Sequence, residues 1–506
     1  MSAPGSRDAQ LLAIKERAVA RLAFLPGVTG VGLGGRTRDG RPTGELVLKV
    51  YVHRKRPRSE LTPAETLPER FEGLGIDVGE LGPIVPHTID IGEAGTLAFS
   101  AVDASVAHED SGKYRPLSGG VRILPAAEGS LLGTLGCFVE HQTDPSKVYG
   151  LTAHHVIAPN ASVHAVAGST RVGQPDADAS LSRCLSNLVG TFAGGSENTV
   201  RDAALIQLDP GTEWLAELVA IGLVTGTHTI TPEEAATGTY EVRKRGALTG
   251  RTGGVVDSIG TLGTSNGVTR HNNIVIIPNP NGVTTGPGFF AGDGDSGSAV
   301  INDAYEVVGL HIGGSPADSP VHKAFALPFE DTLAEFAKPE NENLPLKLAV
   351  RSQLGQVNVV PGAKSAVPVE LPALAGGMPP YPQLLARVAA DLDRSAAGRR
   401  LAALWSDHRD ELSALVNGQR RLAVAWHRGG GPALLQVMIR AAADPGLAVP
   451  RTINGQAPNV RLARLYATFR AVASPDLRRA LDQAYADLPD LAGLTYPQIL
   501  SALAAA

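Results

Sequence analysis

The spacing of hydrophobic and polar positions changes along the chain and predicts its first elements. Residues 8–24 carry apolar side chains at steps of three and four, which predicts an amphipathic helix. Apolar, β-branched stretches at 28–35 and 45–52 are separated by a turn-forming Asp-Gly sequence and predict a β-hairpin. A proline in the segment 62–65 predicts the start of a further helix. We therefore expect a small α/β N-terminal domain over residues 8–95.

Between residues 115 and 350 the pattern becomes one of short apolar runs separated by glycine, proline, asparagine and aspartate. The clearest of these runs are residues 133–139, 151–153, 203–208, 240–242, 254–256, 273–277, 298–301 and 307–312. Short runs with turn signals between them predict an all-β domain of the barrel or sandwich class.

The last third of the chain changes to a helical period. Residues 351–380 are rich in proline and glycine and poor in large apolar side chains, which predicts a linker. In residues 381–506 apolar positions recur at three- and four-residue steps, with short breaks, which predicts an all-α bundle of about four to six helices. No pattern in this bundle indicates chemistry, so we expect it to bind a regulatory protein partner.

Composition narrows the class of protein and its compartment. The net charge is −5 over 506 residues, without a long run of lysine or arginine, which argues against a nucleic-acid or membrane partner. The chain contains two cysteines, Cys137 and Cys184, and no apolar run of the roughly 18 residues that a membrane span needs. Its first residues lack the apolar core of a secretory signal. We therefore expect a cytoplasmic protein.

The segment Gly292–Val300 contains the strongest candidate for catalytic chemistry. It places Ser296 among glycines, directly before an apolar stretch. Glycine allows backbone conformations that a side chain would forbid, so successive amide N–H groups can point at one position beside a hydroxyl. Such a turn can supply a nucleophile together with the donors that stabilise a developing negative charge.

A serine hydroxyl needs a neighbouring base, and the base needs a group that holds its tautomer. His155 ends the sequence Thr-Ala-His-His, and Asp202 begins the sequence Asp-Ala-Ala-Leu. With Gly-Asp-Ser-Gly around Ser296, these motifs resemble in order and spacing those of the trypsin-like (chymotrypsin-fold) serine proteases. The resemblance covers residues 115–350 and implies a domain of two β-barrels with the three residues at their interface.

The resemblance also implies a role for each residue. Ser296 would be the nucleophile, His155 the general base and then the acid, and Asp202 the group that orients the imidazole. The backbone N–H groups of Gly294 and Ser296 would form the oxyanion hole. His154 is the alternative base, although the motif favours His155. This chemistry hydrolyses a protein or peptide substrate through an acyl-enzyme, with no metal and no cofactor.

Two other classes of function compete with a serine endopeptidase that is regulated or targeted by its flanking domains. A catalytically silent scaffold or binding protein would keep the protease fold without turnover, but it has no need of a complete triad and oxyanion hole. An esterase of the α/β-hydrolase kind is disfavoured because its chain order is Ser, Asp, His, whereas this chain has His, Asp, Ser.

Three residues are expected, from the resemblance, to line the first specificity pocket. Phe290, six residues before the serine, would form the floor of this pocket. An aspartate at this position would favour lysine or arginine in the substrate, and this chain has none there. His311 lies where bacterial glutamyl endopeptidases have a histidine that faces the bound side chain, and Lys323 would reach the rear of the pocket. A histidine and a lysine would favour an acidic or small polar side chain through charge-assisted hydrogen bonds.

Activation is expected to differ from that of secreted zymogens. Asp295 lies where those enzymes receive a newly freed amino terminus. The nearest look-alike of such a terminus, Leu117–Val121, follows Arg115-Pro116, and a proline after arginine makes that bond a poor cleavage site. We therefore expect the intact chain to be active, or to be switched by a partner.

Overall fold

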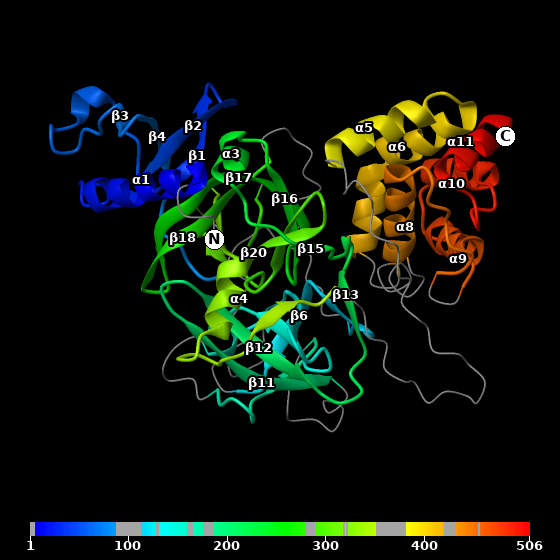
Figure 1. Cartoon of the computed structure of the whole chain (residues 1–506), viewed down its shortest axis with the longest axis horizontal. Helices are drawn as coiled ribbons and strands as arrows, with labels where there is room; N and C mark the ends of the chain where they lie inside the picture. Colours follow the sequence, from blue (N-terminus) through cyan, green and yellow to red (C-terminus); the bar gives the residue numbers. More distant parts are fainter. Residues whose placement is uncertain are drawn as a thin grey trace. The chain divides into compact units, whose positions relative to one another are not determined.

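The structure is a computed structural model (Figure 1). It describes residues 6–87, 113–127, 131–158, 165–175, 187–279, 289–316, 319, 322–350, 381–418, 422, 431–453 and 456–506. By contacts the chain divides into two compact units, the first made of residues 1–113, 119–210 and 225–349 and the second of residues 114–118, 211–224 and 350–506. The predicted linker, residues 351–380, lies outside the described residues.

The first unit is built mainly of strands. They are β1 (Val28–Arg38), β2 (Arg41–Val52), β3 (Arg70–Phe71), β4 (Leu74–Glu80), β6 (Val121–Pro125), β7 (Gly133–Leu135), β8 (Cys137–His141), β9 (Val148–Thr152), β10 (Arg171–Gly173), β11 (Leu188–Glu197), β12 (Asp202–Leu208), β15 (Gly226–Thr227), β16 (Glu241–Gly246), β17 (Gly250–Ser265), β18 (Val268–Pro278), β19 (Ala299–Asn302), β20 (Glu306–Gly314), β21 (Ala324–Pro328) and β22 (Leu346–Leu348). Its helices are α1 (Arg7–Leu22), the short 3-10 turn η1 (Arg58–Glu60), α2 (His154–Ile157), α3 (Pro232–Ala236) and α4 (Phe329–Ala337). Each strand-like run predicted between residues 133 and 312 overlaps a strand, so the prediction of an all-β region is confirmed at this level.

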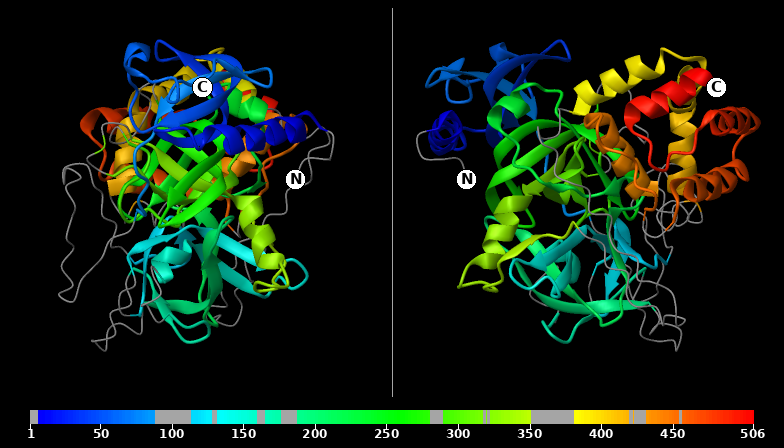
Figure 2. Two further views of the ribbon diagram at one scale, coloured as in Figure 1. Left: turned by 90° about the vertical axis from the view of Figure 1, so that its left-hand side faces the viewer. Right: turned by 45° about the vertical axis from the view of Figure 1, so that its right-hand side comes forward.

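The N-terminal region contains the predicted helix and hairpin. Helix α1 is capped by Ser6, whose side chain accepts a hydrogen bond from the backbone of Ala9, and it packs against β1 and contacts β17 (Figures 1 and 2). The hairpin turns at Asp39 and Gly40, both with positive φ, which is the backbone conformation that an Asp-Gly turn supplies. Phe24, expected on the apolar face of the helix, lies beyond its end and is 86% exposed.

The prediction that a helix begins in the segment 62–65 is wrong. The structure has only a turn there, in which the carboxylate of Glu65 accepts hydrogen bonds from the backbone and hydroxyl of Thr62, at 2.9 and 2.8 Å. The physical reason is Pro68: the residue before a proline is disfavoured in the helical conformation, so the first turn cannot continue.

One long sheet joins the N-terminal region to the barrel strands. Strand β16 pairs with β19 and also with β17, so the order β16, β19, β20, β21, β18, β17 returns to its start and forms a closed ring. Strand β1 pairs with β17 at Leu33↔Ile259 and Gly34↔Ser258, and β2, β4 and β3 continue the same sheet. A Cβ on Gly34 would lie 2.2 Å from the carbonyl oxygen of Asp257, so this close approach of the two strands requires glycine.

A second sheet, in the order β22, β8, β9, β12, β11, β10, β6, β7, forms the other half of the strand-rich part. Within it β9 and β12 are neighbours, and Ala204 pairs with Thr152. This register brings the beginning of β12 beside the end of β9, where the two predicted catalytic residues Asp202 and His155 are found.

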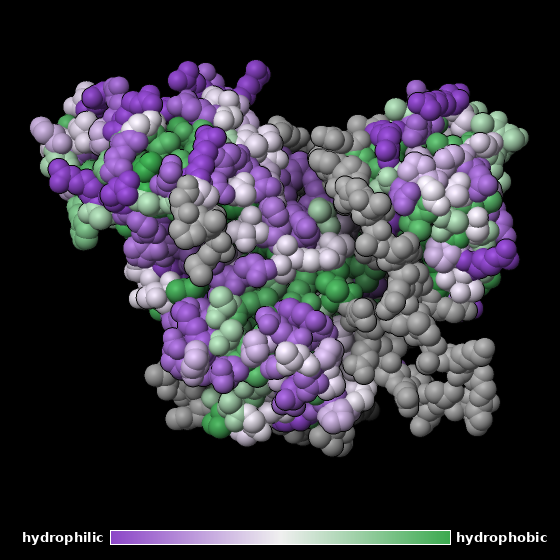
Figure 3. Space-filling view, viewed as in Figure 1, coloured by the Kyte–Doolittle hydropathy of each residue, from purple (hydrophilic) through white to green (hydrophobic). Residues whose placement is uncertain are grey.

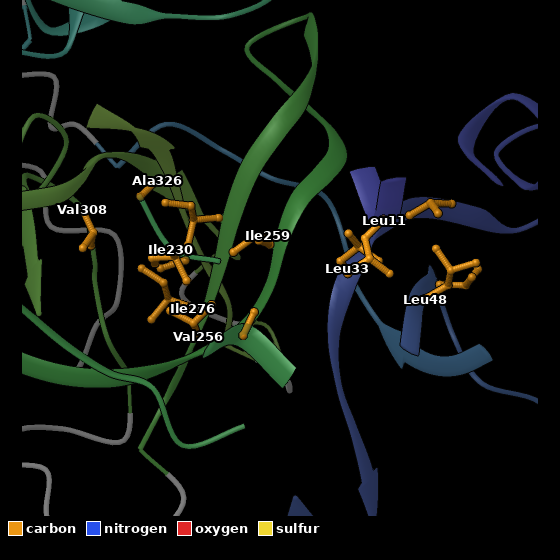
Figure 4. Close-up of a cluster of buried hydrophobic side chains, with 14 of the residues drawn as sticks. Leu11, Leu33, Leu48, Ile230, Val256, Ile259, Ile276, Val308 and Ala326 are labelled. Carbon is orange, nitrogen blue, oxygen red and sulfur yellow. The ribbon is translucent and has the colours of Figure 1, made fainter. Parts of the chain in front are cut away.

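A single hydrophobic cluster spans the N-terminal region and the closed ring. It contains Leu11 of α1 and Leu33 and Leu48 of the hairpin, together with barrel residues such as Ile259 and Ile276 (Figure 4). The exterior of the N-terminal region is mostly hydrophilic in the view of Figure 3. Burial of this shared apolar surface favours keeping the region on the barrel, because each buried side chain of this size contributes about 1.5–3 kcal/mol.

A buried charge network reinforces the same junction. The carboxylate of Asp257 on β17 pairs with Lys49 of β2 at 3.2 Å and with Lys323 at 2.5 Å, and it accepts a hydrogen bond from the hydroxyl of Tyr51 at 2.8 Å. Lys49 is also paired with Asp77 of β4, at 2.8 Å. Lys49, Tyr51 and Lys323 are buried and the two carboxylates are partly buried, so each buried lysine depends on its acidic partners for stabilisation.

The second unit combines a small sheet with helices. Its strands are β5 (Leu117–Gly119), β13 (Trp214–Leu218) and β14 (Gly222–Leu223), and its helices are α5 (Tyr381–Leu392), α6 (Ala396–Gly418), α8 (Gly431–Ala443), α9 (Pro458–Arg470), α10 (Pro475–Asp487) and α11 (Tyr496–Ala505). Helix α8 contacts β14, so residues 211–224 belong with the helices and not with the strand-rich unit. Trp405 of α6 is 54% exposed.

Within the described part of the chain, no helix is both long and apolar enough to cross a membrane. Cys137 is a buried free cysteine, and burial raises the pKa of its thiol. Cys184 lies outside the described residues.

Candidate active site

His155 and Asp202 come from the two neighbouring strands of the second sheet. His155 lies in α2, the short helix directly after β9, and Asp202 is the first residue of β12. Both are almost completely buried, at 1% and 2% exposure. The short helix follows from a local sequence in which Ala153 has an extended backbone and acts as its N-cap.

The contacts of these two residues fix the orientation of the imidazole. Nδ1 of His155 lies 2.6 Å from Oδ2 of Asp202, and the backbone N–H of His155 donates to Oδ1 at 3.2 Å. Burial would raise the pKa of Asp202, but the charge and hydrogen bonds of His155 lower it to about 2. The carboxylate is therefore ionised at neutral pH and holds the proton of the imidazole on Nδ1, which leaves Nε2 free to act as a base.

His154, the alternative base, lies in a different environment. Its ring is near that of Phe192, with 6.4 Å between the ring centroids, and burial lowers the pKa of its imidazole. The hydrogen bonds to Asp202 are made by His155.

Ser296 lies in the turn that leads into β19. Gly294 and Gly297 on its two sides have φ values of 89° and 92°, so both positions favour glycine. A Cβ on Gly297 would lie 2.9 Å from the backbone nitrogen of Ala153, which places the turn against the residue just before α2. The turn and the His155–Asp202 pair therefore meet, although they are far apart in sequence.

The carboxylate of Asp295 anchors this turn from inside. It accepts hydrogen bonds from the backbone of Gly292 at 3.1 Å and of Thr249 at 3.2 Å, and it forms a fully buried ion pair with Lys244 of β16. Burial lowers the pKa of Lys244, against the opposing effect of Asp295. The carboxylate of Asp295 was predicted to lie where secreted zymogens receive a freed amino terminus. In the structure this carboxylate is paired with a cation of the same chain, Lys244.

Two backbone N–H groups of the turn converge on one oxygen atom. The N–H of Gly294 and the N–H of Ser296 both donate to the carbonyl oxygen of His87, at 2.8 and 3.0 Å. Two amides that share one carbonyl oxygen beside a serine hydroxyl are the arrangement that an oxyanion hole requires.

The hydroxyl of Ser296 has partners other than the imidazole. Its Oγ accepts a hydrogen bond from the N–H of His87 at 3.1 Å and donates to the carbonyl of Ile312 at 3.2 Å. Among the described residues, the buried Nε2 of His155 has no hydrogen-bond partner.

The three residues predicted for the specificity pocket have different surroundings. Phe290 is 1% exposed, with Lys244 5.8 Å from its ring centroid. His311 is fully buried, and its Nε2 lies 3.2 Å from Nδ1 of His87. Burial holds the pKa of His311 well below its ordinary value, with His87 adding to the effect. Lys323 pairs with Asp257, so the charge expected at the rear of the pocket is already compensated.

Sequence reasoning missed His87 and Lys244. His87 is 209 residues from Ser296, and no motif surrounds it. Its only local signal is the pair Pro83 and Pro86, which favours an extended backbone at the residues before them. In the described part of the chain, no group of three or more His, Cys, Asp or Glu side chains could hold a metal ion.

No protein-family model and no curated protein matches this chain. The solved structures that it resembles are bacterial serine proteases of the trypsin/chymotrypsin fold. A glutamic acid specific serine protease, described as using a histidine triad in substrate binding, is 17% identical and aligns over 46% of this chain and 100% of its own, with a TM-score of 0.32. Thermobifida fusca protease A is 20% identical with the same coverage and a TM-score of 0.32. Cellulomonas bogoriensis chymotrypsin is 19% identical over 46% of this chain and 100% of its own, with a TM-score of 0.31.

Proposed function

We propose that this protein is a serine endopeptidase in which Ser296, His155 and Asp202 act as a catalytic triad. The observation that carries the proposal is the convergence of the Gly294 and Ser296 amides on a single carbonyl oxygen, at 2.8 and 3.0 Å. A buried His155–Asp202 pair lies against the same turn and supplies the base. Nucleophile, base, orienting carboxylate and oxyanion donors are the groups that acyl transfer needs.

The mechanism follows from these positions. Oγ of Ser296 turns from Ile312 toward Nε2 of His155, gives its proton to that nitrogen and attacks the substrate carbonyl. The oxygen becomes negatively charged and is stabilised by the two N–H groups, each contributing about 3 kcal/mol. The imidazolium then protonates the leaving amine, and water hydrolyses the acyl-enzyme by the same steps in reverse order. Asp202 stabilises the imidazolium throughout.

The architecture that goes with this function is a double-barrel protease domain between an N-terminal α/β domain and a helical C-terminal domain. Chain-wide properties support a cytoplasmic enzyme with a protein or peptide substrate and no nucleic-acid partner: the net charge is −5, without a long basic run. The helical domain is the part proposed to bind a regulatory protein.

The specificity pocket is proposed to be lined by Phe290 and His311. Because Lys323 is neutralised by Asp257, the lysine contributes no free charge with which to hold a carboxylate. The imidazole of His311, which burial keeps neutral, favours a polar, uncharged side chain that can share a hydrogen bond. We therefore narrow the expected preference, which was for acidic or small polar side chains, to neutral polar ones.

Labelling with a fluorophosphonate probe tests the function. A His87→Gly variant, whose segment offers no side chain to the pocket, is expected to react with the probe, and Ser296→Ala in this background abolishes the reaction. Ser298→Ala is the matched control, because Ser298 is equally buried and its hydroxyl has no hydrogen-bond partner among the described residues. Absence of labelling in both the native chain and His87→Gly would identify the protein as a silent scaffold.

A further inference from the structure

A segment of the chain itself lies in the proposed active site as an extended strand. Val85 forms an antiparallel bridge with Gly314, in which each N–H donates to the other carbonyl at 2.9 Å. The bridge pairs Val85 with the last residue of β20, in the way in which an extended peptide adds to a strand. A Cβ on Gly313 would lie 2.3 Å from the carbonyl oxygen of Val85, so the segment uses space that a side chain would fill.

His87 occupies the place of the residue whose carbonyl is attacked. Its carbonyl oxygen accepts from both oxyanion donors, and its N–H donates to Oγ of Ser296 at 3.1 Å. The two donated hydrogen bonds polarise the His87 carbonyl group, and the N–H of the same residue contacts the nucleophile.

The side chain of His87 fills a pocket that matches an imidazole. It is 3% exposed; Nδ1 lies 3.2 Å from Nε2 of His311, and Nε2 lies 3.2 Å from the carbonyl oxygen of Ser315. A carbonyl oxygen only accepts, so Nε2 of His87 carries the proton and Nδ1 receives one from His311. Both nitrogens are satisfied, whereas an aliphatic side chain would leave His311 and Ser315 without these contacts.

The N-terminal region delivers this segment at a fixed position. Strand β4 ends at Glu80, and the next residue, Leu81, is 2% exposed and donates its N–H to Val52 of β2 at 2.9 Å. Only five residues separate Leu81 from His87. Since β1 and β2 belong to the sheet of the barrel, the segment is presented within the same molecule, and an intramolecular reaction of this kind has a high effective concentration.

We infer that the peptide bond on the carboxyl side of His87 is a self-cleavage site, hydrolysed in cis by Ser296, and that the pocket beside His311 selects histidine. The inference rests on the proposed function. Oγ of Ser296 forms an ester with the His87 carbonyl carbon, the bond to the nitrogen of Thr88 breaks, and the proton that left Oγ passes through His155 to that nitrogen. Water then cleaves the ester, leaving a carboxylate on His87 and restoring the Ser296 hydroxyl.

The cleaved segment remains in the site as a product. The pairing of β1 with β17 and the Asp257 network hold the N-terminal region on the barrel without the covalent bond. The new carboxyl terminus therefore competes with other substrates at the same position, and the activity of the enzyme toward peptides is restrained by its own product. Cleavage here does not supply an amino terminus to Asp295, which Lys244 already neutralises.

Intact-mass analysis of the native chain, Ser296→Ala and His87→Ala tests the inference. The native chain is expected to yield two fragments, one ending at His87 and one beginning at Thr88, that co-elute in gel filtration. The rate should be unchanged by about a hundredfold dilution, as for a reaction in cis. Ser296→Ala stays a single chain, and His87→Ala slows cleavage roughly 100-fold because the polar groups of the pocket lose their partner. His53→Ala, an exposed histidine of the same region, should behave like the native chain.

A peptide assay separates failure of this inference from failure of the proposed function. The His87→Gly variant is offered Ile-Val-Pro-His-aminomethylcoumarin and, as the competitor, Ile-Val-Pro-Glu-aminomethylcoumarin, with the histidine peptide expected to be cleaved at least about tenfold faster. A native chain that remains whole while His87→Gly reacts with a fluorophosphonate overturns self-cleavage and leaves the endopeptidase standing. Cleavage that persists in Ser296→Ala also overturns it. Absence of both labelling and cleavage in every variant removes the proposed function itself.

Discussion

The ammonium group of Lys244 forms a fully buried ion pair with the carboxylate of Asp295, the residue directly before Ser296. Lys244 also donates to the hydroxyl of Thr249, which in turn donates to Asp295. Because the carboxylate of Asp295 accepts hydrogen bonds within the turn that carries the Gly294 and Ser296 amides, this lysine supplies, from within the chain, the positive charge that compensates it. The pair explains how the turn is ordered in the intact chain.

Replacing Lys244 by methionine is expected to lower kcat/KM roughly 100-fold or more. Without the ion pair, Asp295 would no longer hold the N–H groups of Gly294 and Ser296 so that both donate to one oxygen atom. It should also reduce the free energy of unfolding by about 3–5 kcal/mol, since Asp295 is left buried and uncompensated. Peptide hydrolysis and urea denaturation measure the two effects. Arg243→Met is the control, as Arg243 lies on the same strand but pairs with Asp303, which is only partly buried. An unchanged kcat/KM in Lys244→Met would contradict this role.

Thr249→Val provides a milder test of the same turn. It removes the hydroxyl that donates to Asp295 and accepts from Lys244, and it keeps the ion pair. We expect a smaller loss of stability, about 0.5–1.5 kcal/mol, with a measurable loss of kcat. If Lys244→Met does not fold, this variant still reports whether the turn governs catalysis.

Asp202→Asn is expected to leave the chain folded and to lower kcat by about four orders of magnitude, because an amide in this position favours the wrong imidazole tautomer. Steady-state kinetics with circular dichroism as a check on folding measures this. Asp209→Asn, at the other end of β12, removes a partly exposed pair with Arg171 and should change kcat little. Equal activity in Asp202→Asn would refute the orienting role.

Local sequence was sufficient to predict the elements whose chemistry is local. The hairpin of β1 and β2 follows from alternation and an Asp-Gly turn, and the strands around Ser296 follow from short apolar runs between glycines. The approach of His155 to Asp202 could be expected from the family motifs, and in the structure it arises from the pairing of β9 with β12. In each case the signal lies within a few residues of the feature.

Contacts between distant segments were beyond the reach of those patterns. Nothing near Lys323 indicates that its partner is Asp257, 66 residues away, and so the predicted pocket charge did not account for its neutralisation. The pairing of β1 with β17 depends on glycines that look like ordinary turn residues in the sequence. The position of His87 depends in turn on that pairing, which is why no motif predicted it.

The grouping of residues 211–224 with the helices has the same origin. These residues were predicted as part of the single protease domain over residues 115–350. In the structure β13 and β14 form a separate small sheet with β5, and β14 contacts α8. The contact partner of β14, helix α8, lies more than 200 residues later in the chain, and no local period predicts such a contact.

Asp257→Asn is expected to destabilise the first unit by about 3–5 kcal/mol, because Lys323 would be left as a buried, unpaired charge. Lys323 and Lys49 hold the pKa of Asp257 below its usual range although burial acts to raise it. A carboxyl group with a lowered pKa stabilises the fold above its unfolded pKa of about 3.9 and loses that contribution as the pH falls further. Urea denaturation at neutral pH measures the loss, and Asp39→Asn, an exposed turn residue at positive φ where asparagine is tolerated, is the control.

The occupancy of the site by His87 is expected to depend on pH. Burial lowers the pKa of the His87 imidazole from its ordinary value of 6.5, and Lys244 adds to this, while the charges of Asp293 and Asp295 oppose it. The neighbouring His311 is also kept neutral by burial. A histidine with a lowered pKa in the bound state takes up a proton more readily once released, so acid favours release.

The bound segment should therefore be fully populated above about pH 6.5 and be released progressively as the pH falls below it. Nuclear magnetic resonance of the Ser296→Ala chain measures this without interference from cleavage, through the ring proton of His87 identified by comparison with His87→Gly. We expect that proton to titrate below pH 6.5. A titration of His87 above pH 6.5 would mean that the pocket prefers the charged imidazole. The segment would then be released as the pH rises, and the prediction would be contradicted.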